Sequence, residues 1–310
     1  MSRRLLMLAA MMAAISPLIV GGVPEPGKGM VQDLVVLLTD YGTCDFYVGA
    51  LEGSIYSANP DARISAITHE VAAFDVAEGS YILAQAAREY PPGTVFAAEV
   101  DPGVGAGVRS IVLETKDGKI FVGPDNGLFT GVMDELGFAA VREVRNLSLT
   151  RRGDGSAAFK GVEVYGPVAG RLAGGVATSE VGPEIFDPVR IEAARAGIED
   201  GVLVGAVAHV DHWGNLVTNI PHHLADEAGL APNDSIEIAV GGNVVEAAFG
   251  STYSDVPRGE MVAFVGFMGS LEIAINMDSA AEDLGASAGD SVRVRKVLKV
   301  QTSQSLKVQR

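Results

Sequence analysis

Residues 100–110 read VDPGVGAGVRS, and they join an apolar run at Val95–Val100 to a second run at Ile111–Thr115. Both runs are predicted to be strands because they are short, apolar and bounded by turn residues. The three glycines between them allow positive φ and a close approach of the backbone to a ligand. Asp101 stands at the carboxyl end of the first strand, the edge at which open α/β sheets bind ligands. Alternatively, Asp101 only accepts a hydrogen bond from its own turn.

Apolar runs alternate with helical patterns on either side of this turn. Leu34–Leu38 is apolar throughout, as expected for a strand that is covered on both faces. Two further strands are predicted at 64–67 and 120–122, and helices are predicted at 46–57, 75–89, 127–136 and 164–173. The alternation indicates an α/β domain with a mostly parallel sheet and helices on its faces.

The pattern changes after the proline-containing segment 183–201, which is the expected domain boundary. Beyond it lie short apolar or alternating runs separated by turns, at 202–210, 215–220, 235–240, 244–249, 260–265, 271–275 and 291–296. This spacing predicts a smaller antiparallel β-barrel-like domain. The expected organisation is a signal peptide and linker at 1–30, an α/β domain at 31–190, a β domain at 201–296 and a polar tail at 297–310.

Composition narrows the class of protein. The chain has 310 residues, 48% of them hydrophobic, which is enough for a well-buried core in one large or two ordinary domains. Its formal charge of -16 argues against nucleic acid as a partner. The single cysteine, Cys44, excludes an internal disulfide and a cysteine-ligated zinc site. We expect no metal site, because the five histidines form no HExxH pattern.

The first thirty residues resemble a secretory signal. Arg3 and Arg4 precede an apolar run at Leu5–Val20, and small residues follow it. The run is short for a stable membrane span. We expect export, with a periplasmic product; the alternative is translation from Met30 and a cytoplasmic product.

Two acids follow the first predicted strand. Asp40 ends that strand, and Asp45 stands at the start of the next helix. Carboxylates at a strand-to-helix junction can accept hydrogen bonds from the paired hydroxyls of a ribose. Asp45 can also cap the helix, and the two roles are compatible.

A set of short motifs runs through both predicted domains: TDYGT at 39–43, NPDA at 59–62, THE at 68–70, FDV at 74–76, DPGVG at 101–105, GPDNG at 123–127, DHWGNLVTN at 211–219, TYSDV at 252–256 and LEIAIN at 271–276. In these motifs and their order the chain resembles the S-adenosyl-L-methionine (SAM) hydroxide adenosyltransferase family, adenosine-forming hydrolases related to the fluorinase and the chlorinase. Each segment alone is weakly specific, whereas the ordered set is strong.

The resemblance implies a homotrimer that binds SAM as substrate, with no cofactor, between the α/β domain of one subunit and the β domain of the next. By position, Asp40 holds the ribose hydroxyls with Asp45 nearby, and Asp211 binds the methionine amino group. The other implied contacts are Phe74 and Phe159 beside the sugar and sulfonium, and Asn215, Tyr253, Asn276 and Glu272 on the adenine side. The aromatic residues are equally compatible with core packing, and Asn276 with a cap on the helix at Ala280.

The implied reaction is attack of water or hydroxide on the ribose C5′, with Asp101 orienting the nucleophile. Family hydrolases use an Asp, Arg, His triad, which is incomplete here. The arginine falls at Val108, with Arg109 one residue later and so on the opposite face of a strand. Arg109 can take the catalytic place of that arginine only if the glycine turn absorbs the shift. The histidine falls at Lys160, which either pairs with Asp101 and lowers its pKa or, if desolvated, acts as a base.

Because the triad residues differ from those of the family hydrolases, three alternative functions must be weighed. A halide-using enzyme is disfavoured, because related halogenases resemble one another in having a tyrosine at the position of Asp101, and a carboxylate repels a halide. The altered triad also suits a protein that binds SAM or adenosine without turnover. A metal-dependent phosphohydrolase using Asp40, Asp45 and Asp101 is disfavoured, because no histidine accompanies these acids at ligand spacing.

Overall fold

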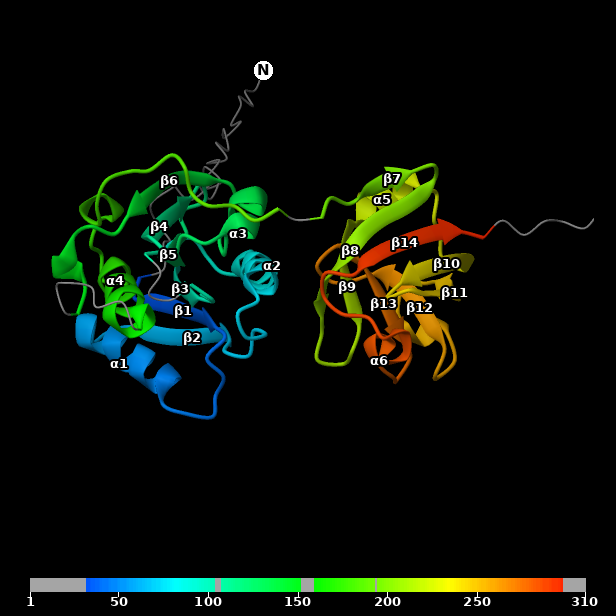
Figure 1. Ribbon diagram of the computed structural model, residues 1–310, viewed down its shortest axis with the longest axis horizontal. Helices are drawn as coiled ribbons and strands as arrows, with labels where there is room; N and C mark the ends of the chain where they lie inside the picture. The colour runs from blue at the N-terminus through cyan, green and yellow to red at the C-terminus, as the bar shows by residue number, and fades with distance from the viewer. Residues whose placement is uncertain (1–31, 104–106, 152–158, 193, 298–310) are drawn as a thin grey trace, which may run out of the picture.

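The computed structural model describes residues 32–103, 107–151, 159–192 and 194–297, which form two domains joined by an extended segment (Figure 1). The expected signal peptide and all but the first residue of the expected tail lie outside these ranges. So does Val104–Ala106, the middle of the glycine turn. Among the described helices, none has the length and apolar character that spanning a bilayer requires.

The N-terminal domain is built on a six-stranded sheet in the order β2-β1-β3-β5-β4-β6. Its strands are β1 (Leu34–Thr39), β2 (Arg63–Thr68), β3 (Val95–Glu99), β4 (Ser110–Thr115), β5 (Ile120–Pro124) and β6 (Phe138–Glu143). The strands β2, β1, β3 and β5 run parallel to one another, and β4 pairs antiparallel with β5 and β6. The predicted mostly parallel sheet is therefore confirmed.

Helices cover both faces of this sheet, because its strands are apolar on both sides. Val35 and Leu37 of β1 point to the face covered by α1 (Tyr47–Ala58) and α4 (Gly166–Ala173). Val36 and Leu38 point to the face covered by α2 (Val76–Ala87) and α3 (Thr130–Glu135). All four side chains are fully buried, which explains why the run lacks the polar alternation of a half-exposed strand.

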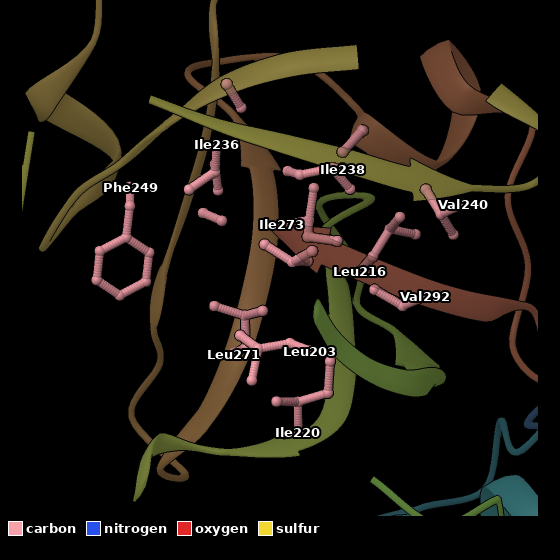
Figure 2. Close-up of a cluster of buried hydrophobic side chains, with 14 of the residues drawn as sticks. Leu203, Leu216, Ile220, Ile236, Ile238, Val240, Phe249, Leu271, Ile273 and Val292 are labelled. Atoms are coloured by element: carbon pink, nitrogen blue, oxygen red, sulfur yellow. The ribbon is translucent and has the colours of Figure 1, made fainter. Parts of the chain in front are cut away.

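The C-terminal domain is a closed barrel. Its strands are β8 (Val202–Val210), β9 (Leu216–Pro221), β10 (Asp234–Val240), β11 (Asn243–Phe249), β12 (Met261–Val265), β13 (Ser270–Ile275) and β14 (Ser291–Lys296), with the short β7 (Gly197–Glu199) added beside β8. Pairing of β14 with β8 closes the ring, and every pairing except β11–β12 is antiparallel. Inward-facing side chains such as Leu216, Ile238 and Ile273 fill the interior (Figure 2). The barrel also carries α5 (His222–Glu227) and α6 (Ala280–Leu284).

The two domains meet where α2 faces β8 (Figure 1). His209 of β8 and Glu78 of α2 form a hydrogen bond of 2.9 Å between Nδ1 and Oε1. This hydrogen bond makes the largest contribution to lowering the pKa of Glu78.

Three elements were not predicted. The strand β6 follows α3 closely, and its sequence FAAVRE has only one β-branched residue. The strand β7 is only three residues long, and α5 is a short helix that begins at the two histidines His222 and His223. The helix predicted at 164–173 is preceded by a π-helical turn, η2 (Gly161–Tyr165).

Candidate active site

The carboxyl ends of three neighbouring parallel strands bring polar side chains to one edge of the sheet. Asp40 follows β1, Asp101 follows β3 and Asn126 follows β5. The chain leaves β1 toward β2 on one side, whereas β3 lies on the other side, so the strand order reverses between β1 and β3. Open α/β sheets bind ligands at such a reversal point. Asp40 and Asp101 flank it.

Asp101 is buried and only half satisfied. Its Oδ1 accepts hydrogen bonds from the Gly103 amide at 2.9 Å and from Asn126 Nδ2 at 3.5 Å. Asn126 is fixed in turn by donating to the Val100 carbonyl oxygen. Asp101 Oδ2 is buried and has no hydrogen-bond partner among the described residues. The local turn expected as an alternative role therefore exists, but it uses one oxygen and leaves the other for a ligand or water.

Asp40 and Phe74 are joined through the backbone. Asp40 Oδ2 accepts a hydrogen bond from the Phe74 amide at 2.9 Å, and Phe74 has a φ of 68°. Positive φ is strained for an aromatic residue, and the Asp40 carboxylate stabilises it. The Phe74 ring is 66% exposed, so it is not a core residue.

Asp45 lies outside this contact. It is exposed, and its Oδ1 accepts a hydrogen bond from the Tyr47 amide at 3.2 Å, at the start of α1. The predicted capping role is not observed, because the N-cap of α1 is Phe46 and no side-chain hydrogen bond caps the helix.

Phe159 belongs to an aromatic cluster with Tyr41 and Tyr47. Its ring centroid lies 5.1 Å from each of theirs, at angles of 44° and 70°. Phe159 is half-buried, so part of this cluster faces solvent. Such a cluster can pack against a sugar or a sulfonium.

Glu99 was missed in the sequence, although it is the last residue of a strand that is otherwise apolar. It is 3% exposed, and burial, reinforced by Asp101, raises its pKa to about 8. Its Oε2 accepts a hydrogen bond from the Tyr41 hydroxyl. The sequence did contain a clue to this residue, because a glutamate that ends the otherwise apolar strand VFAAE is expected to be buried with it.

Lys160 and Arg109 engage partners other than Asp101. Lys160 is buried and donates a hydrogen bond to the Val108 carbonyl oxygen, and its charge acts on Glu99. Arg109 Nη2 lies 2.6 Å from Asp125 Oδ2, and Arg109 Nη1 lies 3.0 Å from Asp187 Oδ1. Both contacts of Arg109 are therefore with acids other than Asp101.

The remaining predicted residues lie in the barrel. Asp211 accepts hydrogen bonds from the amides of Trp213 and Asn215, at 2.9 and 2.8 Å, and from Asn215 Nδ2 at 2.7 Å. Three of its roughly four acceptor positions are therefore occupied, and about one remains for a ligand. Glu272 has a raised pKa because it is partly buried and lies near Asp211.

Asn215, Tyr253 and Asn276 line one cavity of about 710 Å³, together with the exposed Trp213. Asn276 Nδ2 donates to the Val256 carbonyl oxygen at 2.8 Å. The alternative that Asn276 caps the next helix is wrong, because Ser279 is the N-cap of α6. The cavity has an apolar aromatic wall and amide groups, which suits a purine base.

The described residues contain no group of three or more histidine, cysteine or acidic side chains arranged to hold a metal ion. The carboxyl edge of the sheet holds instead Asp40, Glu99, Asp101 and the aromatic cluster, and the barrel holds the amide-lined cavity.

Both domains match a known protein family. Residues 35–182 match the SAM hydroxide adenosyltransferase N-terminal domain, and residues 205–293 match the SAM hydroxide adenosyltransferase C-terminal domain. The (R)-S-adenosyl-L-methionine hydrolase of Methanocaldococcus jannaschii is 32% identical over 85% of this chain and 96% of its own length. A fluorinase of Actinoplanes is 27% identical over 87% of this chain and 99% of its own length.

The fold is shared as well. The crystal structure of an uncharacterized conserved protein from Thermotoga maritima superposes with a TM-score of 0.82, at 36% identity, over 84% of this chain and 99% of that one. Because both of its domains match the corresponding family domains, the chain belongs to the SAM hydroxide adenosyltransferase family.

Proposed function

We propose that this protein hydrolyses SAM at the ribose C5′, giving adenosine and L-methionine, and that Asp101 orients the attacking water. The observation that carries the proposal is the buried Oδ2 of Asp101, which has no hydrogen-bond partner in the described part of the chain. A buried acceptor without a partner is costly unless a ligand or water completes it. The family's hydrolases and fluorinases support chemistry at C5′ of SAM in general.

The chemistry suits a pocket with fixed carboxylates. SAM is a sulfonium, and its positive charge disappears as the C5′–S bond breaks and methionine leaves as a neutral thioether. A carboxylate held by its own turn needs no reorganisation when the water attacks. Asp40 has acceptor capacity beyond its one bond to Phe74 and would bind the ribose hydroxyls.

We propose further that the active unit is a homotrimer in which two subunits complete each site. Asp40, Glu99 and Asp101 lie in the α/β domain, whereas the cavity lined by Asn215, Tyr253 and Asn276 is formed by barrel residues alone. Each half exposes a large aromatic side chain. Phe74 is 66% exposed in one and Trp213 is 73% exposed in the other, as expected of surfaces that a ligand and a second subunit cover.

The second candidate is a protein that binds SAM or adenosine without turnover. It is favoured by the contacts of Arg109 with Asp125 and Asp187, and of Lys160 with the Val108 carbonyl, because these leave Asp101 without the charged partners of the family triad. A halide-using transferase is less well supported, since Asp101 would repel a halide ion.

Product analysis separates these functions. Purified protein lacking residues 1–30 is incubated with SAM in water enriched in ¹⁸O, beside a heat-inactivated control. The hydrolase forms adenosine that carries the isotope in its 5′ hydroxyl and methionine that carries none. Saturable heat in calorimetry without adenosine would identify the binding protein instead.

A further inference from the structure

Glu99 and Asp101 share one face of the sheet. Residues of β3 alternate between the two faces, so that Val95 and Ala97 pack against the α1 and α4 side while Phe96 and Ala98 pack against the α2 and α3 side. Glu99 continues the first series, and Asp101 follows two residues later. The two carboxyl groups therefore come to the same side of the carboxyl edge, and the charge of Asp101 helps to raise the pKa of Glu99.

Tyr41 and Gly161 enclose the carboxyl group of Glu99. The Tyr41 hydroxyl donates to its Oε2, and Gly161 lies so close that a Cβ there would collide with both groups. Glu99 Oε1 is buried and, like Asp101 Oδ2, has no hydrogen-bond partner among the described residues. Two adjacent carboxyl groups thus each keep one oxygen for a further proton or water.

We propose that Glu99 receives, through Asp101, the proton that the attacking water loses. This inference rests on the proposed function. The water oxygen forms a bond to C5′, the C5′–S bond breaks and its electron pair stays on sulfur. One water proton passes by way of the Asp101 carboxylate to Glu99, so that the positive charge of the sulfonium and the negative charge of Glu99 disappear together. The proton later returns to solvent.

The charged groups around Glu99 suit this role. Burial raises the pKa of Glu99 to about 8, and Asp101 and Asp40 add to the increase, while the Gly161 amide and the Lys160 ammonium oppose it. Tyr165 of η2 also faces the pair, and burial followed by the charge of Glu99 raises its own pKa. A general base is most effective when its pKa lies near the working pH. Glu99 must be ionised to accept a proton, so activity rises with pH.

The test compares the pH dependence of turnover in the wild type and in Glu99→Gln, with Glu114→Gln as the matched control. Glu114 lies on β4 and accepts a hydrogen bond from Thr178, away from the carboxyl edge. If one group with a pKa of about 8 must lose its proton, the wild-type kcat/KM rises about 100-fold between pH 6 and pH 9. The same rise is expected in Glu114→Gln. In Glu99→Gln the residual rate changes less than about threefold over this range, since glutamine does not titrate.

A second test follows the titration of Glu99 itself and does not depend on turnover. In wild-type protein with ¹³C-labelled glutamate, one carboxyl resonance should titrate near pH 8, be absent in Glu99→Gln and titrate at lower pH in Asp101→Asn. An unchanged pH profile in folded Glu99→Gln, or no such titration, overturns the inference and leaves the proposed function intact. Wild-type protein that forms no adenosine at any pH instead contradicts the proposed function, and with it the role of Glu99.

Discussion

A single methyl group added at position 161 should disturb both stability and chemistry. In the structure, a Cβ on Gly161 would occupy the space of the Tyr41 hydroxyl and the Glu99 carboxylate, and neither group is the free end of an exposed side chain. Gly161→Ala must therefore separate Tyr41 from Glu99 or displace η2. Overpacking of a buried site costs about 1–3 kcal/mol. For a protein of this size, that lowers Tm by about 2–10 °C.

The matched control is Gly53→Ala in α1. Gly53 is exposed, and nothing lies within 4 Å of the position that its Cβ would take. Alanine in a helix interior is better than glycine by about 0.5–1 kcal/mol, so this variant should melt at or above the wild-type temperature. Calorimetry on the purified proteins gives both values. If Gly161→Ala melts as high as the wild type, the close packing of Tyr41, Glu99 and Gly161 described above is refuted.

Three further predictions concern Arg109, the assembly of the site from two subunits, and the contact of Glu78 with His209. Arg109→Ala should lower the free energy of unfolding by about 1–3 kcal/mol, because buried Asp125 loses a charged partner. The kcat of this variant should stay within about tenfold of the wild-type value. A large loss of kcat with an unchanged Tm would instead place Arg109 in the catalytic machinery. A second prediction mixes Asp101→Asn with a barrel variant that has been measured to be inactive on its own, for which Asn276→Ala is the first choice. Unfolding and refolding an equal mixture should restore about one quarter of the wild-type activity if each site joins two subunits of a closed ring, and none if each chain holds a whole site. Glu78→Gln should lower Tm more at pH 7 than at pH 3. The lowered pKa of Glu78 means that its carboxylate stabilises the fold above its ordinary pKa and loses this effect as the pH falls through the lowered value. Equal Tm differences at both pH values would contradict this.

The strands of the barrel could be predicted closely from sequence. Val202–Val210 has the same bounds as β8, and Ser291–Lys296 the same bounds as β14. Their alternating or apolar runs end at turns that require glycine, such as Gly241 and Gly242, which both have positive φ between β10 and β11. In contrast, β6 was missed because its sequence has little β propensity, and its place is set by pairing with β4.

The candidate site was only partly predictable. Asp40 and Asp101 could be found because each directly follows an apolar strand and parallel strands end at one edge. The partners of Arg109 could not, because Asp187 lies 78 residues away in the chain and reaches Arg109 only through the tertiary fold. Glu99 was not singled out because it lies inside the predicted strand Val95–Val100, although its burial beside Asp101 makes it the most perturbed carboxyl group at this edge.

The account depends most directly on what Asp101 does for the reacting water. The decisive measurement is the rate of adenosine formation from SAM by Asp101→Asn, with the affinity for adenosine measured on the same samples by calorimetry. Loss of an oriented general-base carboxylate should reduce kcat by about 10²–10⁴, whereas affinity should stay within about tenfold because Asp101 does not hold the nucleoside. Turnover equal to that of the wild type, or a loss of affinity that matches the loss of rate, would contradict the account.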